Sequence, residues 1–94
     1  MSTYVVTYDL IAQGQNYACI TTKLKSYPTH WHIQGSVWII ETDESASNIR
    51  DKLTPCLDAN DKLLVARLSG EAAWYGYSSD GTAWLKGRLE KQVH

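Results

Sequence analysis

Residues 30–42 read HWHIQGSVWIIET, and this stretch decides the fold because it holds two strand-like runs around a turn. Residues 30–33 and 37–42 are rich in β-branched and aromatic side chains, which are typical of strands. Gly35 lies between the two runs and can adopt the positive φ of a tight turn. The stretch therefore predicts a β-hairpin.

An amphipathic segment lies on each side of this hairpin. Apolar side chains recur at helical spacing over residues 15–26, and Pro28 then disfavours helical geometry at the residue before it. A second apolar stripe covers residues 45–57, and the preceding sequence offers side-chain oxygens that can cap a helix. We therefore expect one helix before the hairpin and one after it.

Two further apolar runs complete the pattern. Residues 4–10, YVVTYDL, indicate a central strand because they are almost continuously apolar, and residues 63–68, LLVARL, indicate a fourth strand. Strand, helix, hairpin, helix and strand follow one another as in the split βαβ plan. The sequence predicts an α+β, ferredoxin-like βαββαβ domain with a four-stranded antiparallel sheet in the order 4-1-3-2 and both helices on one face.

The 94 residues suffice for one domain, which we divide into a core at 3–70 and a C-terminal extension at 71–94. The extension carries the aromatic stretch WYGY at 74–77 and predicts a short helix at 82–91. The sheet face without helices needs a cover, because tryptophans lie on its strands. The extension is the natural cover, either on its own sheet or on that of a second copy.

Composition narrows the range of partners. Nine basic against ten acidic residues give a formal charge of −1, which disfavours strong phosphate binding by a single chain. No run approaches the roughly 18 apolar residues of a membrane span, and the N-terminal sequence lacks a secretion signal, so we expect a cytoplasmic protein without a membrane segment. In a reducing compartment, Cys19 and Cys56 are expected to be small core residues rather than a disulfide pair.

Asp9 is the first candidate functional residue, because it follows a buried strand directly. A carboxylate at such a position can bind a hard divalent cation, and two copies related by a dimer axis could share one ion. The alternative is that Asp9 accepts backbone hydrogen bonds from the loop that follows. The neighbouring Tyr8 is a candidate ligand contact.

The hairpin supplies the second group of candidates. His32 could act as a general acid or base, and Ser36 lies across the turn from it. Trp31 and Trp38 could contact a ligand. The alternative for these residues is that they pack in the sheet with their polar atoms satisfied.

Gly14 and Gln15 stand where the first predicted helix begins, and free backbone N–H groups there could receive an anion. No nucleotide-binding glycine motif, zinc motif or aromatic RNA-binding signature accompanies them. These two residues are therefore candidate ligand contacts without an assigned ligand.

Several of these stretches together resemble a known family, the small bacterial proteins labelled SinR-like. The SinR-like proteins are similar to the second core CRISPR adaptation protein (Cas-two) and to the VapD toxin ribonucleases. The resemblance covers about residues 3–70 and rests on YVVTYDL at 4–10, GQNY at 14–17, HWH at 30–32, SVWII at 36–40, LTP at 53–55 and DKLLV at 61–65.

This resemblance implies a ferredoxin-like homodimer with a function related to RNA or DNA. Metal-dependent nuclease activity in the Cas-two and VapD relatives has been attributed to the aspartate after the first strand, which corresponds to Asp9 here. The resemblance thus implies a ribonuclease or nuclease in which Asp9 of each subunit holds Mg²⁺. The alternative is a non-catalytic dimeric module that binds a nucleotide, a nucleic acid or a protein partner, so whether the chain is an enzyme stays open.

Overall fold

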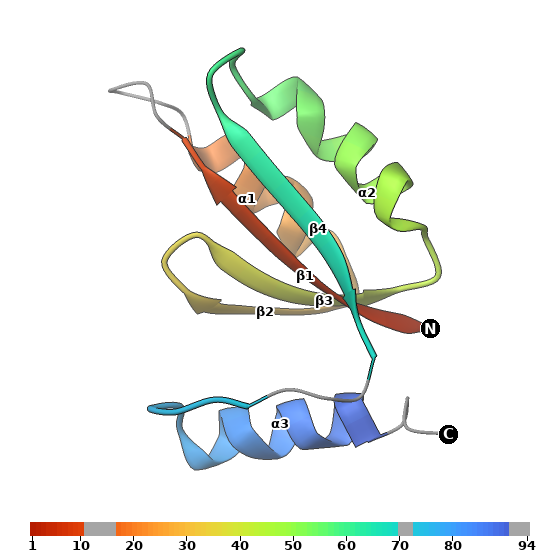
Figure 1. The fold of residues 1–94 in the computed structure, drawn as a ribbon, viewed down its shortest axis with the longest axis vertical. Helices are drawn as coiled ribbons and strands as arrows, with labels where there is room; N and C mark the ends of the chain where they lie inside the picture. Colours follow the sequence, from red (N-terminus) through yellow and green to blue (C-terminus); the bar gives the residue numbers. More distant parts are fainter. Residues whose placement is uncertain (11–16, 70–72, 91–94) are drawn as a thin grey trace.

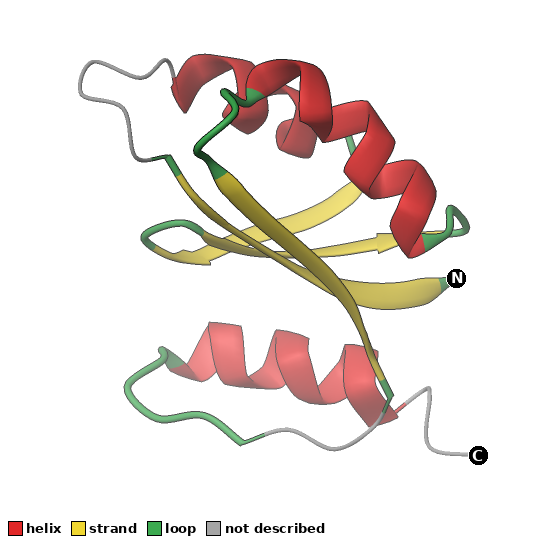
Figure 2. Cartoon of the chain, turned by 45° about the horizontal axis from the view of Figure 1, so that its top comes forward, coloured by secondary structure: helices red, strands yellow, loops and turns green. Residues whose placement is uncertain are grey.

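A four-stranded antiparallel sheet forms the middle layer of the computed structural model, which describes residues 1–10, 17–69 and 73–90 (Figure 1). Helices lie on both sides of this sheet, so the described chain is an α+β fold (Figure 2). The elements follow in the order β1 (Ser2–Asp9), α1 (Tyr17–Lys25), β2 (Thr29–Gln34), β3 (Val37–Thr42), α2 (Ala46–Leu53), the short 3-10 helix η1 (Thr54–Cys56), β4 (Lys62–Leu68) and α3 (Ser79–Glu90).

The strand order is β2-β3-β1-β4, which is the predicted order 4-1-3-2 read from the opposite edge. β1 is central, as its apolar sequence predicts, and it pairs antiparallel with β3 and β4. The register places Val6 opposite both Trp38 and Val65. Antiparallel pairing of all neighbouring strands, and the predicted order, are therefore confirmed.

α1 and α2 cover one face of the sheet (Figure 2). Side chains alternate between the faces of a strand, so Tyr4, Val6 and Tyr8 of β1 all face these two helices. They meet the buried apolar stripes of α1 and α2 there, in one core cluster that contains Ile20, Leu24, Ile49 and Leu53. The spacing of these apolar residues thus positions both helices on the same side of β1.

A disulfide joins Cys19 of α1 to Cys56 of η1, so the expectation of two reduced cysteines is wrong. The helix expected over 45–57 ends as an α-helix at Leu53, and a 3-10 turn around Pro55 then carries Cys56 towards α1. The two Cα atoms are 5.5 Å apart, within the range that a disulfide spans. Disulfides are typical of oxidising compartments, so this bond counts against the expected cytoplasmic location, which stays a prediction.

α3 covers the opposite face of the same chain's sheet (Figures 1 and 2). Trp31 of β2 points to this face, where its ring contacts Trp84 of α3 and Tyr77 just before the helix, with centroids 5.6 and 5.5 Å away. The sequence predicts a helix that begins at residue 82, but α3 begins at Ser79. The start is earlier because Ser78 acts as the N-cap and accepts a hydrogen bond from the Gly81 N–H. Of the two alternatives for the extension, the structure therefore shows the cover on its own sheet.

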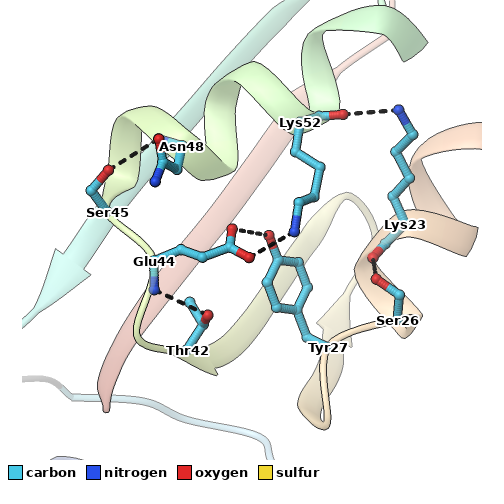
Figure 3. A network of polar contacts seen from close by, with 8 residues as sticks. All are labelled: Lys23, Ser26, Tyr27, Thr42, Glu44, Ser45, Asn48 and Lys52. Atoms are coloured by element: carbon cyan, nitrogen blue, oxygen red, sulfur yellow. Dashed lines mark hydrogen bonds and ion pairs between the residues drawn. The ribbon is translucent and has the colours of Figure 1, made fainter.

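A polar network links the segment before α2 and the last turn of α2 to the end of α1 (Figure 3). Glu44 accepts hydrogen bonds from the Lys52 ammonium at 2.7 Å and from the Tyr27 hydroxyl at 3.1 Å, and the Lys23 ammonium donates to the Lys52 carbonyl. The Lys52 contact lowers the pKa of Glu44, and the same contact raises the pKa of Lys52. Burial, reinforced by Glu44, raises the pKa of Tyr27. The network thus favours an ionised Glu44 and a neutral Tyr27.

None of the helices within residues 1–10, 17–69 and 73–90 combines the length and the hydrophobicity that crossing a bilayer requires.

Candidate functional site

The end of the sheet at which β1 finishes brings together most of the residues that the sequence singles out. β1 ends at Asp9 there, β2 ends at Gln34, and β3 and β4 begin at Val37 and Lys62. The Tyr8 N–H donates to the Ser36 carbonyl at 3.2 Å, which ties the end of β1 to the hairpin turn. Gly35 in this turn has a φ of +34°, as its place between the strands predicts.

A row of aromatic rings lies at this end of the sheet, on the face that α1 and α2 cover. We call Tyr17, Tyr8, Trp38 and His32 the aromatic row. The Tyr8 and Tyr17 ring centroids are 6.4 Å apart, and the Trp38 indole N–H donates to the Tyr8 hydroxyl at 3.1 Å. The His32 ring is stacked on Trp38, with centroids 4.3 Å apart and planes within 6°. The row therefore runs from α1 across β1 and β3 to the edge strand β2.

Burial changes along the row. Trp38 is only 1% exposed and Tyr8 only 6%, whereas Tyr17 is 48% exposed and His32 is exposed as well. Because Trp38 covers one face of the His32 ring, the exposed area of that ring lies on its other side. Trp38 is thus a support for His32 rather than a surface that a ligand can touch, and His32 and Tyr17 are the accessible ends.

One hydrogen bond fixes the orientation of the His32 ring and the tautomer of its neutral form. Its Nε2 atom contacts the Gly35 carbonyl oxygen, which can only accept, so Nε2 carries the proton. In the neutral ring, Nδ1 is then the acceptor. Among the described residues no hydrogen bond joins His32 to the Ser36 hydroxyl, so the two predicted catalytic groups are close in the hairpin without forming a nucleophile–base pair.

Asp9 lies at the same sheet end but on the other face, because it is adjacent to Tyr8 in the strand. It is exposed and lies opposite Lys62 of β4. Thr7 and Leu64 join these two residues around a cavity of about 170 Å³. In the described part of the chain, no group of three or more histidine, cysteine or acidic side chains could hold a metal ion, and among the described residues that line this cavity Asp9 is the one acid.

The remaining candidates are separate from this arrangement. Trp31 points to the sheet face that α3 covers and does not reach the aromatic row. Gly14 and Gln15 lie outside the described residues. Conversely, the sequence interpretation did not assign Tyr17 and Lys62 to the site. Tyr17 follows the Gly14–Gln15 candidates at the start of a helix, which was the available signal, whereas nothing local marks Lys62 because its proximity to Asp9 depends on β1–β4 pairing.

No protein-family model matches this chain, and no solved structure matches it significantly.

Proposed function

We propose that this chain is a ferredoxin-like domain of the SinR-like kind that binds single-stranded nucleic acid at the aromatic row. The order β-α-β-β-α-β of the strands and α-helices from β1 to β4, the sheet order and the common side of α1 and α2 support the ferredoxin-like assignment. The observation that carries the binding proposal is the parallel stack of His32 on Trp38, which holds an exposed ring rigidly at the sheet end.

Such a ring suits the recognition of unpaired bases. Bases that are not held in a duplex stack on aromatic side chains, and each stack contributes about 1–3 kcal/mol. His32 meets this requirement because Trp38 and the Gly35 carbonyl both fix its ring. Tyr17 offers a second exposed ring at the other end of the row. The formal charge of −1 favours a mode of nucleic-acid binding that depends on base stacking more than on phosphate contacts.

Titration of short labelled single-stranded RNA and DNA oligonucleotides, followed by fluorescence anisotropy, tests this binding. His32→Ala should weaken binding about tenfold, which corresponds to ~1.4 kcal/mol. His30→Ala is the matched control, because His30 lies on the same strand face with its ring tilted by 43° and 6.1 Å from that of Trp38. Equal affinities of the two variants would refute stacking on His32, as would binding that disappears with modest salt.

A second candidate function is a Mg²⁺-dependent nuclease that uses Asp9. The observation in its favour is the exposed Asp9 carboxylate at the end of a central strand, beside the cavity that Thr7 and Lys62 share. One carboxylate binds Mg²⁺ weakly, so a second copy has to supply another Asp9. Leu64, which is 59% exposed and faces the same side as Asp9, provides an apolar contact for such a homodimer.

In this candidate, the ion would lower the pKa of a water molecule that attacks the phosphodiester or would stabilise the leaving oxygen. Asp9→Asn should abolish Mg²⁺-stimulated cleavage of oligonucleotides and leave the far-ultraviolet circular dichroism unchanged. Asp51→Asn, which removes an exposed acid from α2, is the control. Sedimentation equilibrium measures the homodimer directly. A monomer, or an Asp9→Asn variant that still cleaves, would exclude this mechanism and leave the binding module.

A further inference from the structure

A second cavity lies on the far side of the edge strand, where α3 meets β2. Its volume is about 300 Å³, at the lower end of the range for small-ligand pockets. Two indoles and one carboxylate dominate its lining, which consists of His30, Trp31, Ser78, Asp80, Gly81 and Trp84. Trp31 lines this cavity. Among the site residues that the sequence predicts and the structure describes, it is the one that lies away from the end of the sheet where β1 finishes.

The aromatic walls of the cavity are preformed. The Trp31 and Trp84 rings meet edge to face, with centroids 5.6 Å apart and planes inclined by 62°, so together they make a corner. Tyr77 packs against Trp31 from another direction at 71° and holds the indole in place, while the Tyr77 hydroxyl donates to the Gln34 side chain at 2.7 Å. The corner is thus supported from the strand and from the segment before α3.

The charge of the cavity is negative. Asp80 is exposed in the first turn of α3 and has no ion-pair partner among the described residues, and no lysine or arginine lines the cavity. His30 adds no charge when neutral, and its Nδ1 proton is engaged with the Tyr27 carbonyl at 2.7 Å. A full negative charge beside two indoles is therefore the dominant electrostatic feature.

The N-terminus of α3 does not turn the cavity into an anion site. The Gly81 N–H already donates to the Ser78 hydroxyl and the Thr82 N–H to the Ser78 carbonyl, so these two donors of the first turn are used. The partial positive charge of a helix N-terminus is about half an elementary charge, and Asp80 in the same turn exceeds it. An anion would meet this carboxylate before it met a free donor.

From this combination we infer that the cavity binds a methylated ammonium group. A cation is attracted to the faces of indole rings, and recognition of quaternary ammonium by aromatic side chains is a recurrent use of this interaction. Asp80 supplies the opposite charge, and Trp31 and Trp84 supply apolar contact for the methyl groups. The same head group occurs in free quaternary amines and in trimethylated lysine side chains, so both are suitable ligands.

Choline and its uncharged isostere 3,3-dimethyl-1-butanol test the inference on the full chain without any substitution. Titration followed by tryptophan fluorescence should give an affinity for choline about tenfold higher than for the isostere, because the two differ in charge and not in shape. A peptide that carries trimethyllysine, compared with its unmodified form, tests the second source. Preference for either methylated, charged probe over its counterpart supports the site, whereas no preference in either pair, or no binding of any probe, overturns it.

Two single-charge variants assign the binding to this cavity. Asp80→Asn keeps the shape of the side chain and should weaken choline binding about fivefold or more. Asp43→Asn removes the same charge from a side chain that does not line this cavity and is 83% exposed. This variant should leave the affinity for choline unchanged. If the two variants bind choline equally well, Asp80 is not the counter-ion and the assignment fails. Circular dichroism of both variants shows whether α3 is retained.

Discussion

At Gly81, α3 lies directly against the Trp31 indole of the sheet, and Gly81→Ala is the sharpest test of this packing. A Cβ atom at Gly81 would lie 2.5 Å from Cη2 and 2.7 Å from Cζ2 of Trp31, whereas ordinary contacts span 3.4–4 Å. The indole or the helix would therefore have to move by about 1 Å. Trp84 and Tyr77 both contact the same indole, so it cannot move without loosening those contacts as well.

Two opposing effects set the magnitude. Forcing an extra methyl group into a packed contact costs about 1–3 kcal/mol. Replacing glycine by alanine inside a helix contributes about 1 kcal/mol in the other direction. Gly81→Ala should therefore lower the free energy of unfolding by about 0–2 kcal/mol. Gly87→Ala is the matched control in the same helix, because a Cβ atom there meets nothing within 4 Å, and it should raise stability by up to about 1 kcal/mol.

Urea unfolding followed by circular dichroism measures both variants, and amide hydrogen exchange locates the effect. We expect the two unfolding free energies to differ by about 1–3 kcal/mol, with faster exchange of the α3 amides in Gly81→Ala alone. Equal stabilisation by both substitutions would refute the docking of α3 on Trp31, because the methyl group at Gly81 would then have met no neighbour.

Three further predictions concern the opposite layer. Because Lys52 lowers the pKa of Glu44, the native state gains stability above the ordinary glutamate pKa and loses it as the pH falls through the lowered value. The free energy of unfolding of the native chain should exceed that of Glu44→Gln by about 0.2–1 kcal/mol, as expected for so exposed a pair. Urea titrations at several pH values should show this difference shrink as the pH falls through the lowered pKa of Glu44. A difference that stays constant with pH would contradict this. Replacing Cys19 and Cys56 by alanine should cost about 4 kcal/mol, from the entropy of a loop that closes over 37 residues, and thiol counting by mass spectrometry before and after reduction tests the bond itself. Ser45→Ala should cost about 1 kcal/mol in thermal unfolding, because the Ser45 hydroxyl caps α2 by accepting from the Asn48 N–H; an unchanged midpoint would mean that the cap is not formed in solution.

The sheet was predictable because its signals are local. The run at 37–42 and the turn glycine define β3 and its hairpin by themselves, and β3 spans Val37–Thr42 as predicted. The helix over 45–57 was only partly predictable. Its apolar stripe continues to Cys56, but Pro55 has no N–H to donate, and the last turn tightens into η1.

The disulfide could not be read from the sequence, because cysteine spacing shows no tertiary proximity. Cys19 and Cys56 become neighbours only when α1 and the end of α2 pack on the same sheet face. The contact between α3 and Trp31 could not be predicted from the sequence for the same reason. The aromatic residues of 74–84 indicate an apolar surface, but only the fold selects Trp31 as its contact.

The short motif HWH at 30–32 serves two surfaces because strand side chains alternate. His30 and His32 lie opposite Ile40 and Trp38 on the face towards α1 and α2, and Trp31 between them lies opposite Ile39 on the face towards α3. A shift of the hairpin register by one residue would exchange these faces. The stacking of His32 on Trp38 and the packing of α3 on Trp31 would then both be lost. The two candidate sites therefore depend on one register, although a ligand at either would touch a different side of the sheet. Weaker oligonucleotide binding by His32→Ala with full retention of choline binding is the behaviour that this alternation requires.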